Sequence, residues 1–200
     1  TGRLPFILGD TLVTFDGIPA PLISIQDKLI VCFVPFEVAG TVEVAVSSGG
    51  QRSNGVRVSI VASAPQILSI VNQDGSLNSA EHGAKAGDNI AIYVSGLGQT
   101  NPPSVDGLIT TAPRLPVPIA PVRVFSSNAE LKPTYVGAAP GMIAGITQVN
   151  VQVPSLTANS SPAITIAVNN ANGVLYLVPR IPQFSSESRG KDLHSGSTKH

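Results

Sequence analysis

The stretch Gln148-Val149-Asn150-Val151-Gln152-Val153-Pro154 alternates polar and apolar side chains up to its proline. Successive side chains of an extended chain point to opposite faces, so the valines share one face and the polar residues share the other. Valine also packs well on a pleated, half-buried surface. The stretch therefore predicts a β-strand with one face in a core and the other in solvent.

The same alternation recurs along most of the chain, and no region keeps the i, i+3, i+4, i+7 spacing of a helix for three turns. The other predicted strands are Thr11–Phe15, Thr41–Val46, Val56–Val61, Asn89–Val94, Val122–Phe125, Ala163–Val168 and Val174–Val178. Turn signals lie between the strands, at Asp16-Gly17, Ser48-Gly49-Gly50, Asn54-Gly55 and Asn172-Gly173. Asx-Gly pairs supply the positive φ angles of tight hairpins. Short strands separated by turn signals favour an all-β sandwich.

The composition narrows the functional classes. The 200 residues carry 12 basic and 12 acidic side chains, 12% in all, about half the usual share of about 25%. This balance argues against an electrostatic nucleic-acid binder, which needs a basic excess. A hydrophobic content of 42% and a mean hydropathy of +0.26 argue against disorder. No apolar run approaches the roughly 18 residues that span a membrane, so we expect no membrane span.

An internal match divides the chain. Leu29–Pro35 matches Gln148–Pro154, and each stretch is followed by a turn and an alternating strand. Two copies of one β-sandwich unit explain the match. We place the boundary near Ala62–Pro65, which gives a first unit at 1–64 and a second, more complete unit at 65–181. The first copy lacks its opening strand, so we expect either a longer parent chain with upstream domains or a first unit that borrows a strand.

Two further features concern the single cysteine and the C-terminal end. Cys32 excludes an internal disulfide and lies in an apolar run, so we expect an inert thiol in the core. Residues 182–200 are richer in charge and serine than the rest. We interpret them as a solvated tail, native or vector-derived, with a functional arm as the alternative.

Four stretches in order resemble one known family. They are Thr11–Leu22 with its Asp16-Gly17 turn and Pro-Ala-Pro-Leu end, Val71–Ser79 with Ala86-Gly87, Tyr93–Gly98 followed by Pro102-Pro103 and Val105-Asp106-Gly107, and Ala139-Pro140-Gly141 with Gln148–Pro154. The chain resembles the Solibacter-type C-terminal domain family of secreted acidobacterial proteins over about residues 4–181. The resemblance implies tandem immunoglobulin-like sandwiches outside the cell, and it transfers no catalytic residue.

A small hydrolase acting on an ester, lactone or glycoside is one alternative. The chain contains no Gly-x-Ser-x-Gly elbow, His-Glu-x-x-His or Walker loop. A catalytic triad would have to use His82, the only histidine outside the tail. The candidate orienting carboxylates are Asp74, Asp88 and Asp106, and the candidate nucleophiles are Ser76, Ser79 and Ser95. The other interpretation is a solvated histidine in a glycine-rich connector.

Calcium is the one cofactor that the sequence suggests. Candidate oxygen ligands follow one another at Asn72, Asp74, Ser76, Asn78 and Glu81. Their spacing is like that of a calcium loop, but Gly75 comes too early for the EF-hand pattern. The alternative is a type I or I′ turn at Asp74-Gly75 whose side chains bond to the backbone. Zinc has too few ligands, because only one histidine and one cysteine lie outside the tail.

A glycan-binding module is the other alternative, and three tyrosines, Tyr93, Tyr135 and Tyr176, would have to form its stacking platform. We expect Tyr135 and Tyr176 instead to be sandwich residues with solvent-facing hydroxyls. The loop Gly96–Pro121 is the best candidate for a recognition surface, and the alternative is a loop that packs on the sandwich or on the other copy.

The function that the sequence favours is a non-catalytic module of a secreted or cell-surface bacterial protein. Its work would be spacing, adhesion or contact with another protein or a polysaccharide at the cell surface.

Overall fold

The computed structural model describes residues 2–111, 113, 115–127, 129–155, 163–169 and 171–176. For residues 174–176 it describes the backbone only. Within the described residues the chain is all-β without a helix, and its strands form several antiparallel sheets, consistent with a β-sandwich. The strands are β1 (Ile7–Leu8), β2 (Thr11–Phe15), β3 (Ile18–Pro19), β4 (Leu22–Gln26), β5 (Leu29–Cys32), β6 (Gly40–Ser48), β7 (Gln51–Arg52), β8 (Val56–Ile60), β9 (Gln66–Val71), β10 (Asn89–Ser95), β11 (Thr100–Asn101), β12 (Val117–Pro118), β13 (Val122–Ser126), β14 (Ala129–Leu131), β15 (Tyr135–Ala138), β16 (Ile146–Gln152), β17 (Ala163–Val168) and β18 (Ala171–Tyr176).

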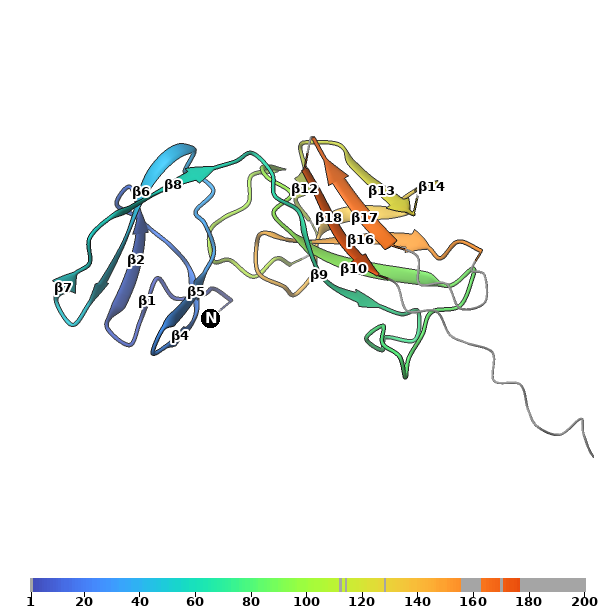
Figure 1. The fold of residues 1–200 in the computed structure, drawn as a ribbon, viewed down its shortest axis with the longest axis horizontal. Coiled ribbons are helices and arrows are strands. Elements are labelled where there is room, and N and C mark those ends of the chain that lie inside the picture. The colour runs from blue at the N-terminus through green and yellow to red at the C-terminus, as the bar shows by residue number, and fades with distance from the viewer. Residues whose placement is uncertain are drawn as a thin grey trace, which may run out of the picture.

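The strands up to β8 form one group, at the left of Figure 1. β2 pairs with β6, and β1 and β3 pair with β2. β7 and β8 both pair with β6. β4 and β5 form a separate two-stranded sheet. The apolar side chains of this group form one cluster, with Val13, Phe15 and Leu22 buried at its centre.

The strands from β9 onward form a second group. Its two four-stranded sheets have the orders β15-β16-β10-β9 and β14-β13-β17-β18. β10 is paired with β16 over its whole length, from Asn89↔Gln152 to Ser95↔Ile146. Side chains of both sheets meet in a second cluster, in which Ile92, Val149 and Ile166 are fully buried. Because the apolar residues of each strand sit at every second position, one face of each sheet builds this core.

The all-β prediction is confirmed, and Thr11–Phe15 and Ala163–Val168 are strands with the predicted bounds. The Asp16-Gly17 turn is also confirmed, since both residues have positive φ (49° and 83°).

Two of the predicted turns are wrong. Asn172-Gly173 lies inside β18, because this strand already pairs at Ala171 with Val168. Between β6 and β7 the reversal is made by Gly49 and Gly50, with φ of 56° and 76°, and it precedes Asn54-Gly55. An Asx-Gly pair permits positive φ without requiring it, and the cross-strand pairing decided the place of these turns. The tail at 182–200 lies outside the described residues.

Replacing Ile92 by alanine should destabilise the second core. Ile92 is fully buried between the two sheets, and removing its side chain leaves a cavity that costs about 2–5 kcal/mol. Urea unfolding followed by circular dichroism measures the free energy of unfolding. Ile119→Ala is the control, since Ile119 is 67% exposed and should change this free energy by less than about 0.5 kcal/mol. Equal losses in both variants would contradict this assignment of the core.

Candidate functional site

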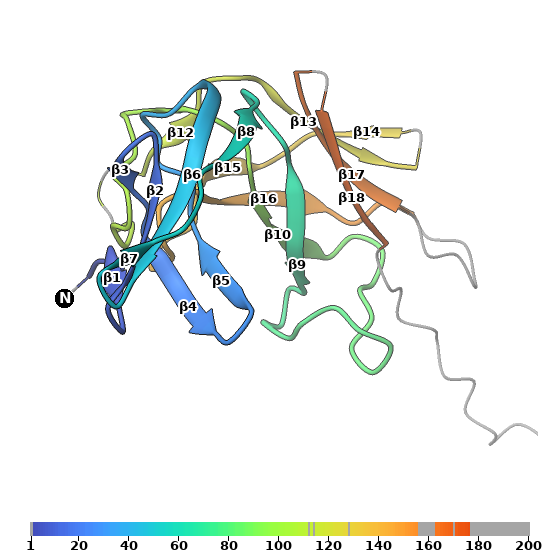
Figure 2. The ribbon, with the colours of Figure 1, turned by 60° about the vertical axis from the view of Figure 1, so that its left-hand side comes forward.

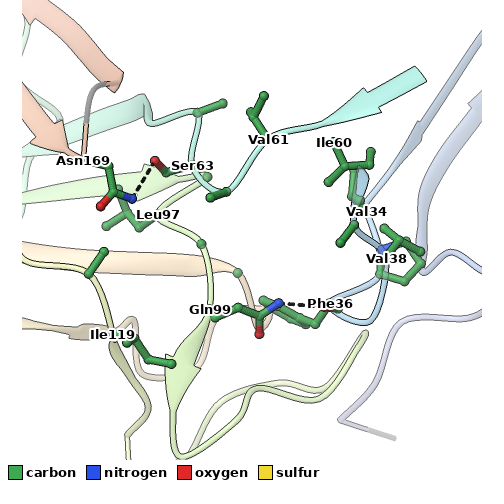
Figure 3. Close-up of a pocket in the computed structure, with 18 of the residues that line it drawn as sticks. Val34, Phe36, Val38, Ile60, Val61, Ser63, Leu97, Gln99, Ile119 and Asn169 are labelled. Carbon is green, nitrogen blue, oxygen red and sulfur yellow. Dashed lines mark hydrogen bonds between the residues drawn. The ribbon is translucent and has the colours of Figure 1, made fainter. Parts of the chain in front are cut away.

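A groove of about 990 Å³ lies between the two core clusters. One side is formed by residues after β5 and by β8, including Val34, Val38 and Ile60, and the other by the loop that follows β10, including Leu97 and Ile119 (Figure 3). The connection from β8 to β9 lines its margin, as residues 61–64. No charged side chain of the described residues lines the groove. Its volume and apolar walls are typical of a binding cavity.

The connection from β8 to β9 is held against the loop that follows β10. The Ala64 N–H donates to the Gly96 carbonyl at 2.8 Å. Gly96 and Gly98 have φ of 75° and 85°. A Cβ at Gly98 would lie 2.5 Å from the Ala62 carbonyl oxygen, and a Cβ at Gly96 would overlap the Ala64 carbonyl. Only glycine therefore allows this approach without a shift of the backbone.

A polar side chain fastens the same connection to the second group of strands. The Ser63 hydroxyl donates to the Val168 carbonyl at 3.3 Å and accepts from Asn169 Nδ2 at 3.3 Å. Figure 3 shows Ser63 and Asn169 together at one end of the groove.

The loop 96–121 packs on the first group of strands, as the alternative interpretation of this loop predicted. The Phe36 N–H donates to Asp106 Oδ1 at 3.1 Å, and its carbonyl accepts from Gln99 Nε2 at 2.7 Å. The N-terminal residues join the same contact, since the Leu4 N–H donates to the Gly107 carbonyl and the Ile109 N–H to that of Gly2, both at 2.7 Å. Two separate stretches of the first group, the N-terminal residues and Phe36, thus hold this loop.

Asp106 is the one carboxyl group with a strongly shifted pKa in this contact. Burial is the main cause, and it acts with a hydrogen bond to the Glu37 side chain to raise the pKa of Asp106 from 3.8 to about 6. The Phe36 N–H and the charge of Arg3 act in the opposite direction. The carboxyl group of Asp106 therefore holds a proton to a higher pH than an exposed aspartate does.

The residues that a hydrolase would need are not joined in one relay. Asp106 contacts the junction residues just described. Asp88 accepts from the Lys85 N–H at 3.2 Å, and Ser76 donates to Asp74 Oδ1 at 2.6 Å. Hydrogen bonds from Ser76 and Ser79 are the main cause of the lowered pKa values of Asp74 and Glu81, and the nearby His82 acts in the same direction. Among the described residues the imidazole of His82 has no hydrogen-bond partner, so nothing orients it toward a serine.

The calcium candidates bond to one another and to the backbone. Asn72 Nδ2 donates to Ser76 Oγ and to the His82 carbonyl, at 3.1 and 2.7 Å, and Asn72 Oδ1 accepts from Asn78 Nδ2 at 3.0 Å. Asp74 Oδ1 also accepts the Ser76 N–H at 3.0 Å. Glu81 instead accepts from the Ser79 hydroxyl at 2.8 Å.

This geometry is an Asx turn, in which only Gly75 has positive φ, so the turn is not of type I′. In the part of the chain that the structure describes, no three His, Cys, Asp or Glu residues cluster as metal ligands.

Two further expectations need correction. The Tyr135 hydroxyl does not simply face solvent, because it donates to the Ala138 carbonyl at 3.0 Å. Cys32 packs against the first core but is only half-buried, and this partial burial raises the pKa of its thiol. Among the described strands its own strand, β5, pairs with β4 alone, which leaves the thiol less covered than predicted. The side chain of Tyr176 lies outside the described residues.

Comparison of this chain with family models, with curated proteins and with solved structures found no match. The described residues include no helix that is long and apolar enough to cross a membrane.

The loop Gly96–Pro121, which the sequence offers as a recognition surface, forms one wall of the groove. The sequence did not predict the opposite wall of the groove. That wall comes from apolar residues such as Val34, Val58 and Ile60, which an alternating pattern assigns to a core. A signal for that wall was the prediction that the first copy lacks a strand, because strands without their neighbours leave inward side chains uncovered.

Replacing Asn72 by alanine should destabilise the connector between β9 and β10. Asn72 is 7% exposed and makes three side-chain hydrogen bonds. Loss of such bonds from a buried site costs about 1–3 kcal/mol. Urea unfolding measures the loss, and Asn54→Ala, which removes an exposed asparagine side chain, should stay within about 0.5 kcal/mol of the wild type. An Asn72→Ala variant as stable as the wild type would contradict the assigned network.

Replacing Asp106 by asparagine should change the pH dependence of stability. A carboxyl group whose pKa is raised to about 6 in the folded state binds more protons there than in the unfolded chain. Its contribution is full below pH 4 and is lost as the pH rises through 6. Asparagine stays neutral. The free energy of unfolding of Asp106→Asn should therefore rise relative to that of the wild type, by on the order of 2 kcal/mol between pH 4 and 7.

The control is Asp106→Ala, which leaves the Phe36 N–H without its acceptor. This variant should be less stable than Asp106→Asn at every pH. Parallel pH profiles for the wild type and Asp106→Asn would refute the raised pKa.

Proposed function

We propose that this chain is a non-catalytic module of two tandem immunoglobulin-like β-sandwich units, residues 1–64 and 65–181. The module holds the two units in a fixed relation, and its groove serves protein–protein contact. The observation that carries this proposal is the close approach of the connection between the units to Gly96 and Gly98.

The pairing of the strands supports two related units. In the first group the strands pair in the order β3-β2-β6-β8. In the second group they pair in the order β14-β13-β17-β18, so that β2 corresponds to β13 and β6 to β17. The hairpin β4–β5 likewise corresponds to β15–β16. The strands correspond in chain order, as the match between Leu29–Pro35 and Gln148–Pro154 requires.

The contacts across the junction support a fixed relation of the units. A linker of four residues, Ala62–Pro65, would by itself leave considerable freedom. Here it is bonded through Ala64 and Ser63 to the second unit, and the loop 96–121 is bonded to the first unit at Phe36. A joint that is bonded on both sides resists bending.

The proposed setting is a secreted or cell-surface protein, as the resemblance to the Solibacter-type C-terminal domain family implies. A formal net charge of zero fits a protein partner better than a nucleic acid. The hydrolase and glycan-binding alternatives have no comparable support in the geometry of His82 or of the tyrosines.

Replacing Gly98 by alanine should loosen the junction. The added Cβ lies 2.5 Å from the Ala62 carbonyl oxygen, so the linker has to move away. Spin labels at the exposed positions Gln51 and Lys132, in a Cys32→Ser background, report the distance between the units by electron–electron double resonance. We expect one narrow distance distribution in the parent protein and a distribution at least twice as broad in Gly98→Ala.

The matched control is Gly75→Ala. Gly75 has the same φ of 85°, but a Cβ there meets nothing within 4 Å. This variant carries the same backbone strain and should keep the narrow distribution. A broad distribution in the parent protein would refute the fixed spacing.

A further inference from the structure

The open edge of β5 is the strongest unassigned feature of the molecule. β5 pairs with β4 on one edge and with no described strand on the other (Figure 2). Its counterpart in the second unit, β16, lies between β15 and β10. We propose that the open edge of β5 binds an extended, apolar-alternating strand from a separate polypeptide, in antiparallel pairing. This inference rests on the correspondence of the two units in the proposed function.

Backbone groups at the end of the matched stretches show what the edge lacks. In the second unit the Val153 N–H donates to the Asp88 carbonyl at 2.8 Å, and the Val153 carbonyl accepts from the Gly87 N–H at 2.9 Å. Val34 is the matching residue of the first unit. Its N–H and carbonyl have no such partner among the residues that the structure describes. They are free to pair with an added strand.

Side chains on the inner face of β5 are more exposed than the matching side chains of β16. Val149 and Val151 are fully buried and Val153 is 2% exposed, whereas the matching Ile30 and Cys32 are half-buried and Val34 is 46% exposed. A strand in the position of β10 would cover them.

The sheet of the first unit that contains β6 and β8 also has exposed apolar side chains. Val58 pairs with Val42, so the two side chains point to the same face. Val42 is buried, yet Val58 is 39% exposed. Val58 and Ile60 also line the groove together with Val34. Val34, two residues beyond β5, therefore joins the open edge to the groove.

The uncharged side chains of β5 and of the groove indicate what kind of strand would bind there. β5 has the sequence Leu-Ile-Val-Cys, without the charge or proline that usually protects an exposed edge. The described residues that line the groove carry no charge, so the groove suits a neutral segment. The strand that fills this position in the second unit is β10, which turns Ile90, Ile92 and Val94 into the core. A partner strand needs the same alternation of three apolar side chains, with main-chain bonds supplying affinity and the side chains specificity.

A peptide with the sequence of residues 86–98 (Ala-Gly-Asp-Asn-Ile-Ala-Ile-Tyr-Val-Ser-Gly-Leu-Gly) is a direct probe. Cys32 is the only cysteine and lies on the inner face of β5, so its rate of reaction with a thiol reagent reports coverage. We expect saturating peptide to slow this reaction at least tenfold in the full chain. A peptide with serine in place of Ile90, Ile92 and Val94 should have no such effect.

Two variants of the protein separate binding from folding. Val34→Glu places a charge on the inner face and should weaken binding of the peptide at least tenfold. Ile23→Glu is the matched control, because Ile23 is 47% exposed against 46% for Val34 and lies on β4, and it should bind the peptide like the wild type. Near-ultraviolet circular dichroism verifies that both variants fold.

Three results would overturn the proposal. The first is that both peptides protect Cys32 equally, or that neither peptide protects it. The second is protection that rises with protein concentration without peptide, which would assign the edge to a second copy. The third is a thiol that becomes reactive only after removal of residues 182–200, which would assign it to the chain's own C-terminal residues. The spin-label distances test the fixed spacing separately, so failure of one proposal is distinguishable from failure of the other.

Discussion

The close approach of two backbone segments at Gly96 and Gly98 is the constraint on which the remaining architecture depends. The carbonyl groups of Ala62 and Ala64 occupy the space that a side chain would otherwise take. Because this connection is held there, β8 ends beside the second group of strands, and the loop 96–121 reaches Phe36 of the first group. The groove and the buried carboxyl group of Asp106 both result from this arrangement. A methyl group at either glycine would act on all of them together.

Much of the fold could be predicted from the sequence because the strands are locally encoded. Alternation in Thr11–Phe15 and Ala163–Val168 is sufficient to place both strands, since each has one face in a core. The turns at Asn54-Gly55 and Asn172-Gly173 were misplaced for a physical reason. Their local chemistry permits a reversal, but the register with neighbouring strands, which depends on distant residues, determines where the chain turns.

The candidate site was much less predictable. Asn72, Asp74 and Ser76 attracted attention as ligands because their side chains are polar and closely spaced, yet these groups bond to one another. Val34 and Ile60 resemble core residues when they are considered with their neighbours in sequence alone. They line a groove because no described strand covers them, and because residues at least 36 positions away in the sequence form the other wall. Neither fact is contained in a local pattern.

The absence of charge from the lining of the groove has a thermodynamic consequence. Salt screens interactions between charges, so association at a surface without them is insensitive to ionic strength. Burial of apolar area instead gives a negative change in heat capacity, and the enthalpy of association therefore falls as temperature rises. Moderate salt would not release a partner from this groove, and the heat of binding would depend strongly on temperature.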